Sequence, residues 1–135
     1  MSATTSLTEQ NRAVVLGMFE AANRSDIEGV FSFLSDDEFT VIEPLFMPFG
    51  GTYHGKEGFA ELARYLPNYL QINEITVHHT IADGDRVAAV VGIKDVATGE
   101  LTRFIEHFTI KDGKIIENRV FYNDAGTLVD QPKVV

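Results

Sequence analysis

Hydrophobic residues recur at helical spacing in the first part of the chain. Ser6-Leu7-Thr8-Glu9 has the spacing of a capping box, in which a hydroxyl and a later carboxylate satisfy free N–H groups at a helix start. Apolar positions then fall three and four residues apart: Val14, Val15, Met18, Phe19 and Ala22. This pattern predicts a helix that ends near Asn23 and buries one stripe.

Two further segments show the same periodicity. Ser25-Asp26-Ile27-Glu28 is a second capping-box pattern, and the apolar positions that follow it predict a short helix ending near Ser35. A third helix is predicted over 56–66, before Pro67, with one apolar side made of Phe59, Leu62, Ala63 and Leu66.

The rest of the chain is typical of β-structure. A strand is predicted over 38–43, where Pro44 ends it, and four long strands over 72–82, 86–96, 101–111 and 114–122, joined by short turns. Helices followed by strands indicate a single α+β domain over 1–135, with the helices on one sheet face and the 38–43 strand at an edge. Residues 126–135 lack a period and are expected to be a flexible tail or a partner-contacting strand.

Composition excludes several classes of function. The formal net charge is −9, and the basic residues are scattered, which argues against a nucleic-acid partner. The chain has no cysteine, so disulfides and thiol chemistry are excluded. No signal-like or membrane-spanning segment is visible, so we expect a cytoplasmic protein without a membrane contact. His78 and His79 are adjacent on a strand and face opposite ways, so no metal site is expected.

Three stretches carry a resemblance to a known family: residues 40–44 (TVIEP), residues 50–59 (GGTYHGKEGF), and residues 104–115 (FIEHFTIKDGKI) together with 119–124 (RVFYND). With them the chain resembles the SnoaL-like, ketosteroid-isomerase-like members of the nuclear transport factor 2 superfamily. The resemblance implies a cone-shaped fold, in which three helices and a curved, mostly antiparallel sheet enclose a pocket. It also implies a homodimer through the convex sheet face, to which Ile105 and His107 would contribute.

The same resemblance implies a small hydrophobic, carbonyl-containing ligand, proton-transfer chemistry of the isomerase or cyclase type, and no cofactor. Two alternatives stay open. One is a non-catalytic ligand-binding or protein-interaction domain of this fold. The other is a dehydratase or epoxide-hydrolase-type enzyme.

Strand alternation places Glu106 on one face with Phe104 and Phe108. A carboxyl group among phenylalanines is desolvated, which raises its pKa. By resemblance, Glu43 takes the place of the general base and Glu106 that of the proton donor. The alternatives are a solvent-exposed Glu43 at a strand end and a Glu106 paired with a basic residue.

The tyrosine that the isomerases place on the first helix is missing, because Met18 and Phe19 occupy that stretch. Tyr53, Tyr65 or Tyr122 would have to supply the hydroxyl. Asp124 is a third catalytic candidate by analogy with the polyketide cyclases, or else a turn residue.

The predicted pocket lining combines the inward-facing strand positions, the first helix and the loop after Pro44, which we expect to act as a lid or a binding wall. Its members are Met18, Phe19, Phe46, Phe49, Tyr53, His54, Phe104, Phe108, Asn118, Val120 and Tyr122.

Overall fold

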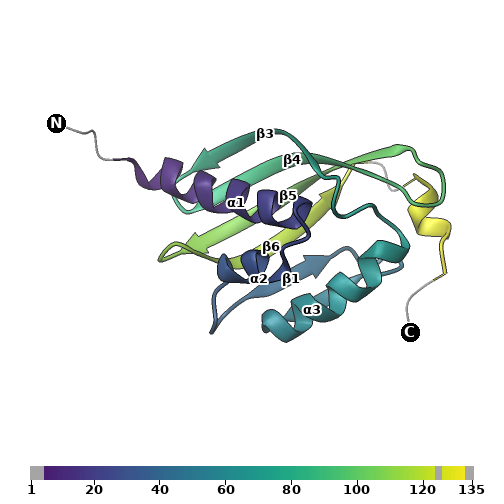
Figure 1. Cartoon of the computed structure of the whole chain (residues 1–135), viewed down its shortest axis with the longest axis horizontal. Coiled ribbons are helices and arrows are strands. Elements are labelled where there is room, and N and C mark those ends of the chain that lie inside the picture. The colour runs from purple at the N-terminus through teal and green to yellow at the C-terminus, as the bar shows by residue number, and fades with distance from the viewer. Residues whose placement is uncertain (1–4, 124–125, 133–135) are drawn as a thin grey trace.

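The computed structural model describes residues 5–123 and 126–132. A six-stranded sheet of order β2-β1-β6-β5-β4-β3 carries three α-helices on one face (Figure 1). The helices are α1 (Leu7–Asn23), α2 (Ile27–Ser32) and α3 (Gly55–Tyr65), with 3₁₀ turns η1 (Leu66–Asn68) and η2 (Gly126–Asp130). The strands are β1 (Thr40–Glu43), β2 (Gly51–His54), β3 (Thr76–Asp83), β4 (Arg86–Lys94), β5 (Leu101–Lys111) and β6 (Lys114–Tyr122). The predicted α+β order is confirmed.

The caps explain where the first two helices begin. Ser6 Oγ accepts from the backbone N–H of Glu9 at 3.2 Å, as the first capping box predicts. The second capping box was predicted to begin at Ser25, but the N-cap of α2 is the next residue, Asp26, whose side chain accepts from Gly29 N–H at 2.9 Å. Ser25 instead takes a left-handed conformation at φ 59°, which turns the chain sharply between the helices. The helix is also shorter than predicted and ends at Ser32.

The sheet differs from the prediction at one edge. β3 to β6 form the expected antiparallel ladder, but β1 lies inside the sheet, parallel to β6. The edge strand is β2, in a segment for which no strand was predicted; it pairs with β1 from Thr40↔His54 to Glu43↔Gly51. Gly55, at φ +69°, then redirects the chain into α3. The placement of β1 matters because it brings Glu43 beside β6.

The third strand is shorter than predicted and begins at Thr76. The chain from 69 to 75 is a connection that crosses toward the end of α1. The side chain of Asn23 holds it there, donating to the Ile75 carbonyl at 2.8 Å and accepting from Ile75 N–H at 2.7 Å.

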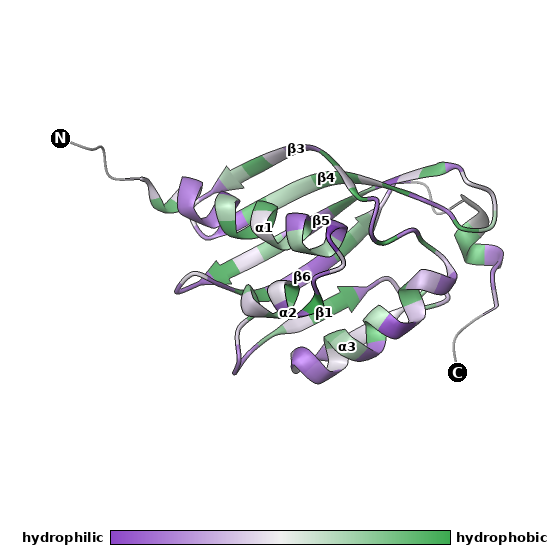
Figure 2. Cartoon of the chain, viewed as in Figure 1, coloured by the Kyte–Doolittle hydropathy of each residue, from purple (hydrophilic) through white to green (hydrophobic). Residues whose placement is uncertain are grey.

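The core lies between the helices and the sheet, and hydrophobic residues, green in Figure 2, occur along both the helices and the strands. On β5, Phe104 and Phe108 are buried while Ile105 is 42% exposed, so the predicted alternation is confirmed. Phe19 packs edge-to-face on Phe108, with ring centroids 5.8 Å apart. The helix-facing side of the sheet is therefore the side that can enclose a ligand.

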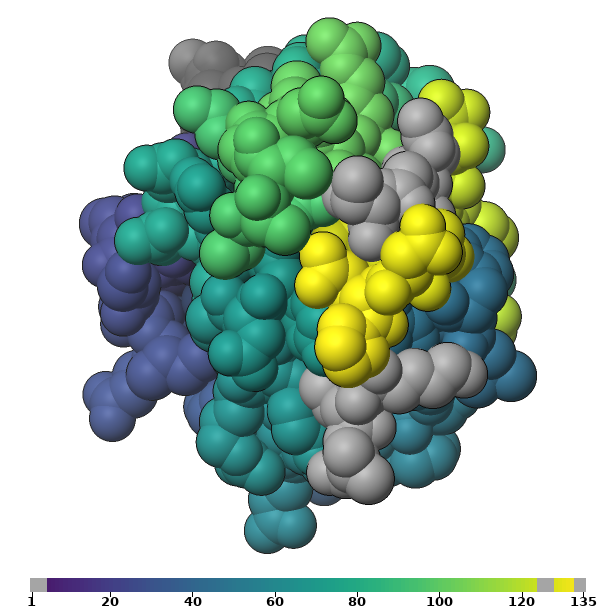
Figure 3. Space-filling view, turned by 90° about the vertical axis from the view of Figure 1, so that its right-hand side faces the viewer, coloured from purple at the N-terminus to yellow at the C-terminus, as the bar shows by residue number. Residues whose placement is uncertain are grey.

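The C-terminal segment packs against the core in the part that the structure describes. Leu128 in η2 is fully buried, and the Tyr69 hydroxyl donates to the Pro132 carbonyl at 2.8 Å. Figure 3 shows η2, in yellow, beside the chain that follows α3. Residues 126–130 thus form a packed 3₁₀ turn rather than a strand, and a contact of this segment with a partner stays a prediction. No described helix is long and apolar enough to cross a membrane.

Candidate functional site

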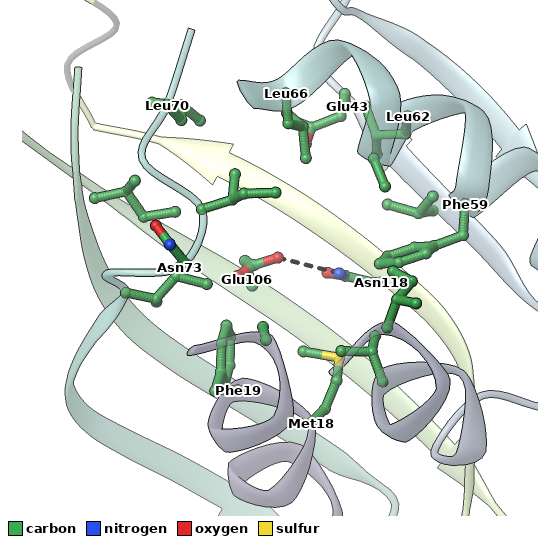
Figure 4. A pocket seen from close by; sticks show the side chains of 18 of the residues that line it. Met18, Phe19, Glu43, Phe59, Leu62, Leu66, Leu70, Asn73, Glu106 and Asn118 are labelled. Atoms are coloured by element: carbon green, nitrogen blue, oxygen red, sulfur yellow. Dashed lines mark hydrogen bonds between the residues drawn. The ribbon is translucent and has the colours of Figure 1, made fainter. Parts of the chain in front are cut away.

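A cavity of about 280 Å³ opens between the sheet and the three helices. Its walls are mainly apolar and come from α1, α2, α3, the 66–75 connection and the inner face of the sheet (Figure 4). The apolar lining consists of Met18, Phe19, Ala22, Ile27, Val30, Val41, Phe59, Leu62, Ala63, Leu66, Leu70, Ile72, Ile75, Ile93 and Phe104. A site of this size and character suits a small hydrophobic molecule.

The mouth of the cavity lies between the α1–α2 turn and the 66–75 connection. Ser25, Asp26 and Asn73 line it and are exposed to solvent. The paired hydrogen bonds between Asn23 and Ile75 join the two sides of this opening. The opening therefore lies beside a fixed connection between α1 and the start of β3.

Glu43 lies on the sheet wall, deep in the cavity. Its side chain is buried, with 5% of the residue exposed, at the last position of β1 before Pro44. The Tyr122 hydroxyl donates to Glu43 Oε1 at 3.4 Å. Burial first, and then the nearby Glu106 charge, raise the pKa of Glu43 well above its usual range, while the Tyr122 hydrogen bond lowers it. This carboxyl group thus favours its protonated form.

Glu106, from β5, lies on the same wall and has a closer hydrogen-bond donor. Asn118 Nδ2 donates to Glu106 Oε1 at 3.1 Å (Figure 4). Burial raises the pKa of Glu106 to about 7, against the opposing effect of the Asn118 hydrogen bond. Glu106 is therefore poised to gain or lose a proton near neutral pH.

Tyr122 completes the polar group at the end of β6. Burial, followed by the charges of Glu43 and Glu106, raises the pKa of its phenol well above 10, so it stays a neutral donor. Its ring also packs on Phe104, with centroids 4.9 Å apart. The hydroxyl missing from α1 thus has a counterpart on β6.

Strand register explains why the two carboxyl groups share one site. Glu106 pairs with Val120 of β6, on one side of that strand. On the other side, Ile42 of β1 pairs with Arg119, so Glu43 follows at the level of Val120. The two glutamates flank β6 at the same height, and both side chains lie on its helix-facing side.

The electrostatic character of the site is acidic or neutral. None of the described residues that line the cavity is a lysine, arginine or histidine. Neither glutamate forms an ion pair with a basic residue in the described part of the chain. The alternative in which a basic residue neutralises Glu106 is therefore not observed. Within residues 5–123 and 126–132, no cluster of three or more His, Asp or Glu side chains could hold a metal ion.

Several residues predicted to line the pocket do so, and others do not. Met18, Phe19, Phe104, Asn118 and Tyr122 line the cavity together with Glu43 and Glu106. Phe108 and Val120 face the same side, but both are buried in the packing beneath the cavity wall.

The loop after Pro44 does not form part of the cavity. Phe46 is 53% exposed to solvent, while Phe49 is fully buried against Tyr69 with ring centroids 5.4 Å apart. Because the chain turns tightly from Pro44 to Gly50, with Met47 N–H bonded to the Pro44 carbonyl, this loop folds away from the cavity. Neither Phe46 nor Phe49 lines the cavity, in contrast to the expected lid or binding wall.

Tyr53 and His54 also lie outside the main cavity. They line a separate, shallow hollow between β2 and α3, together with Glu57 and Glu61. The Tyr53 hydroxyl donates to the Phe49 carbonyl at 2.8 Å, so it holds the loop after Pro44 in place and does not reach the cavity. Asp124, the third catalytic candidate, lies outside the described residues.

Two parts of the lining were not predicted as such. The apolar stripe of α3 was predicted from the sequence. Its periodicity shows that this side of the helix is buried, but it does not distinguish a cavity wall from the packed core. Leu70, Ile72 and Asn73 were assigned to a strand or left without a role, because the 69–75 connection has no periodicity that marks a cavity wall.

The comparisons with known proteins agree with this architecture. TerC, co-crystallised with polyporic acid, superposes with a TM-score of 0.77 at 22% identity, covering 90% of this chain and 99% of that one. A proposed ketosteroid isomerase from Kribbella flavida gives 0.73 at 20% identity, covering 95% and 92%. A nuclear transport factor 2-like protein of unknown function from Burkholderia pseudomallei gives 0.74 at 20% identity, covering 84% and 91%.

These likenesses show the fold alone. A search of the curated proteins gives no match. The family model of the SnoaL-like domain, however, matches residues 15–118, which include the second half of α1, strands β1 to β5, the first part of β6 and both glutamates. The chain therefore belongs to the SnoaL-like domain family, with a nuclear transport factor 2-like fold.

Proposed function

We propose that the cavity binds a small, neutral, apolar metabolite with a carbonyl group, and that Glu43 and Glu106 transfer a proton at the carbon beside this carbonyl. The observation that carries the proposal is the pair of carboxyl groups in one apolar cavity, each with a different hydrogen-bond partner. Because no basic residue lines the described cavity, a ligand with a carboxylate or phosphate group would be repelled.

The hydrogen bonds favour Glu106 as the base. An amide N–H donated to a carboxyl oxygen stabilises the ionised form, and Glu106 has such a donor at 3.1 Å. Glu43 has only the longer contact with a phenol, and a second negative charge beside Glu106 would be unfavourable. The proposed roles are thus the reverse of those that the resemblance implies.

When the ligand is bound, the Tyr122 hydroxyl turns from Glu43 to the carbonyl oxygen, and protonated Glu43 supplies the second hydrogen-bond donor. Glu106 takes the proton from the neighbouring carbon, and the C–H electron pair forms the enolate, whose oxygen gains the negative charge. The two donors stabilise this oxygen in a cavity with little water. Return of the proton to the same carbon gives exchange, and its return to another carbon of a conjugated ligand gives isomerisation.

Among proteins of similar fold, one is a proposed ketosteroid isomerase and another was crystallised with polyporic acid. These likenesses support a small-molecule site by analogy only, because one fold hosts many functions. The particular arrangement of Glu43, Glu106 and Tyr122 is what the proposal depends on.

Hydrogen exchange tests the proposal directly. We expect 2-tetralone, a bicyclic ketone with acidic C–H groups beside its carbonyl, to bind saturably and to exchange these hydrogens in D₂O faster than in buffer. Proton NMR follows both processes. The Ala63→Phe variant, which fills the cavity from α3, is the control and should lose both. Saturable binding without exchange would favour the non-catalytic binding domain, and absence of binding would contradict the proposal.

The Tyr122→Phe variant should slow exchange by about 10²- to 10³-fold, because one donor to the enolate oxygen is lost. We expect the Kd for 2-tetralone to change much less, since the phenyl ring remains. Tyr65→Phe is the matched control, because its hydroxyl bonds to Glu61 outside the cavity. Equal rates for both variants would remove Tyr122 from the mechanism.

We also propose that the sheet face opposite the helices pairs with a second copy of the chain. Exposed apolar residues are adjacent on this face, where Ile105 of β5 pairs with Phe121 of β6. Phe121 is 52% exposed, and Ile81 of β3, on the same sheet, is 66% exposed. A face with such apolar patches is typical of a protein contact.

Light scattering at micromolar concentration should therefore give the mass of a dimer. The Phe121→Arg variant should be a monomer with an unchanged circular dichroism spectrum, since a charge is placed at the contact. A wild-type monomer would contradict the proposed dimer.

A further inference from the structure

The side-chain oxygen of Asn118 has no partner inside the cavity wall. Asn118 is 4% exposed and lines the cavity, and its Nδ2 is committed to Glu106. Its Oδ1 is, among the described residues, the single buried side-chain oxygen or nitrogen without a hydrogen-bond partner. Buried polar atoms are nearly always paired in native proteins, so this oxygen needs a partner that the described chain does not supply.

No neighbour in the cavity wall provides a donor. Around Asn118 the lining is apolar or carboxylic, the Tyr122 hydroxyl is bonded to Glu43, and the polar residues Ser25 and Asn73 lie at the solvent-exposed mouth. The missing donor must therefore come from whatever occupies the cavity. The amide is also held in place, because its Nδ2 bond to Glu106 fixes the direction of Oδ1.

We propose that Asn118 Oδ1 accepts a hydrogen bond from a hydroxyl group of the ligand, which makes the ligand a hydroxy ketone rather than a simple ketone. This inference rests on the ligand class of the proposed function and narrows it. Asn118 thereby acquires a role in specificity in addition to its contact with Glu106.

The sheet register gives the order of the three contacts. Tyr122 and Asn118 lie on the same face of β6, four residues apart, which is about 13 Å along a strand. Glu106 pairs with Val120, midway between them. The ligand therefore presents its carbonyl near Tyr122 and Glu43, its acidic C–H group near Glu106, and its hydroxyl group at the far end near Asn118.

Bicyclic ketones with groups at both ends test this arrangement. The probes are 6-hydroxy-2-tetralone, 6-methoxy-2-tetralone and unsubstituted 2-tetralone, whose Kd values are measured by NMR titration. The methoxy compound keeps the oxygen acceptor and adds one methyl group, but it lacks the donor. We expect the wild-type chain to bind the hydroxy ketone about three- to tenfold more tightly than the methoxy ketone, as for one net hydrogen bond.

Two variants assign the preference to Asn118. Asn118→Leu has a similar volume and no acceptor, so the ratio of the two Kd values should fall to about one. Asn118→Asp keeps an acceptor oxygen and should keep the preference for the hydroxy ketone, although it loses the N–H donated to Glu106. Circular dichroism checks that each variant is folded. This ratio is independent of a general loss of affinity, which a merely structural role would cause.

Equal binding of the hydroxy and methoxy ketones by the wild type would overturn the inference, as when water satisfies Oδ1. A preference that survives in Asn118→Leu would also overturn it. In either case, exchange of 2-tetralone by the wild type would leave the proposed function standing. Conversely, a preference that depends on Asn118, without any exchange, would refute proton transfer and keep the hydroxyl assignment.

Discussion

The Glu106→Gln variant should lose about 10²- to 10⁴-fold of the exchange rate of 2-tetralone, the range for removal of a general base. Glutamine has nearly the same shape and can still accept from Asn118 Nδ2 through its oxygen, but it cannot take a proton. The Kd should therefore stay close to that of the wild type. Proton NMR in D₂O gives the rate and the affinity on the same sample.

The pH profile separates the roles of the two carboxyl groups. Because Glu106 acts as a base only after losing its proton, the wild-type rate should rise as the pH passes about 7. It should fall at higher pH, where Glu43 loses the proton that makes it a donor. This fall should disappear in Glu43→Gln, which keeps a neutral amide donor and much of the activity.

Glu100→Gln, the same chemical change at an exposed turn, is the matched control and should leave the profile unchanged. A loss of activity that is greater in Glu43→Gln than in Glu106→Gln would restore the roles that the family resemblance implies. Full activity in both variants would exclude proton transfer by this pair.

Much of the fold was predictable because its signals are local. The Ser6 cap of α1, its apolar stripe and the alternation along β5 depend on neighbours within a few positions, and all three were confirmed. The parallel pairing of β1 with β6 was not predictable in this way, since it joins residues more than seventy positions apart. Strand β2 was missed because two glycines and a proline around it are typical of a turn.

The same distinction applies to the candidate site. Glu106 could be placed on the inner face from alternation alone, and Glu43 from its position before Pro44 in the family pattern. The loop residues Phe46 and Phe49 were misplaced because a loop has no period that orients its side chains. The partners that distinguish the two glutamates, Asn118 and Tyr122, depend on the register between strands, which only the structure gives.

Glu106→Gln should also stabilise the protein, and more so at pH 8 than at pH 5. In the unfolded chain this carboxyl titrates near 4.5, whereas burial raises its pKa to about 7 in the folded chain. Between these values the unfolded chain has released the proton and the folded chain still holds it. The free energy of unfolding of the wild type therefore decreases as the pH rises through this window.

Glutamine abolishes this dependence, because it carries no proton to lose. A pKa unit corresponds to 1.36 kcal/mol, so we expect a gain of about 2–3 kcal/mol at pH 8, or a Tm higher by about 5–10 °C. At pH 5, near the start of the window, the gain should be small. Thermal denaturation followed by circular dichroism at both pH values measures the difference, with Glu100→Gln as the control for the loss of one negative charge. Equal shifts in Tm at pH 5 and pH 8 would mean that Glu106 has the same pKa in the folded and the unfolded chain. Burial would then not raise the pKa of Glu106, and this argument for its role as the base would fail.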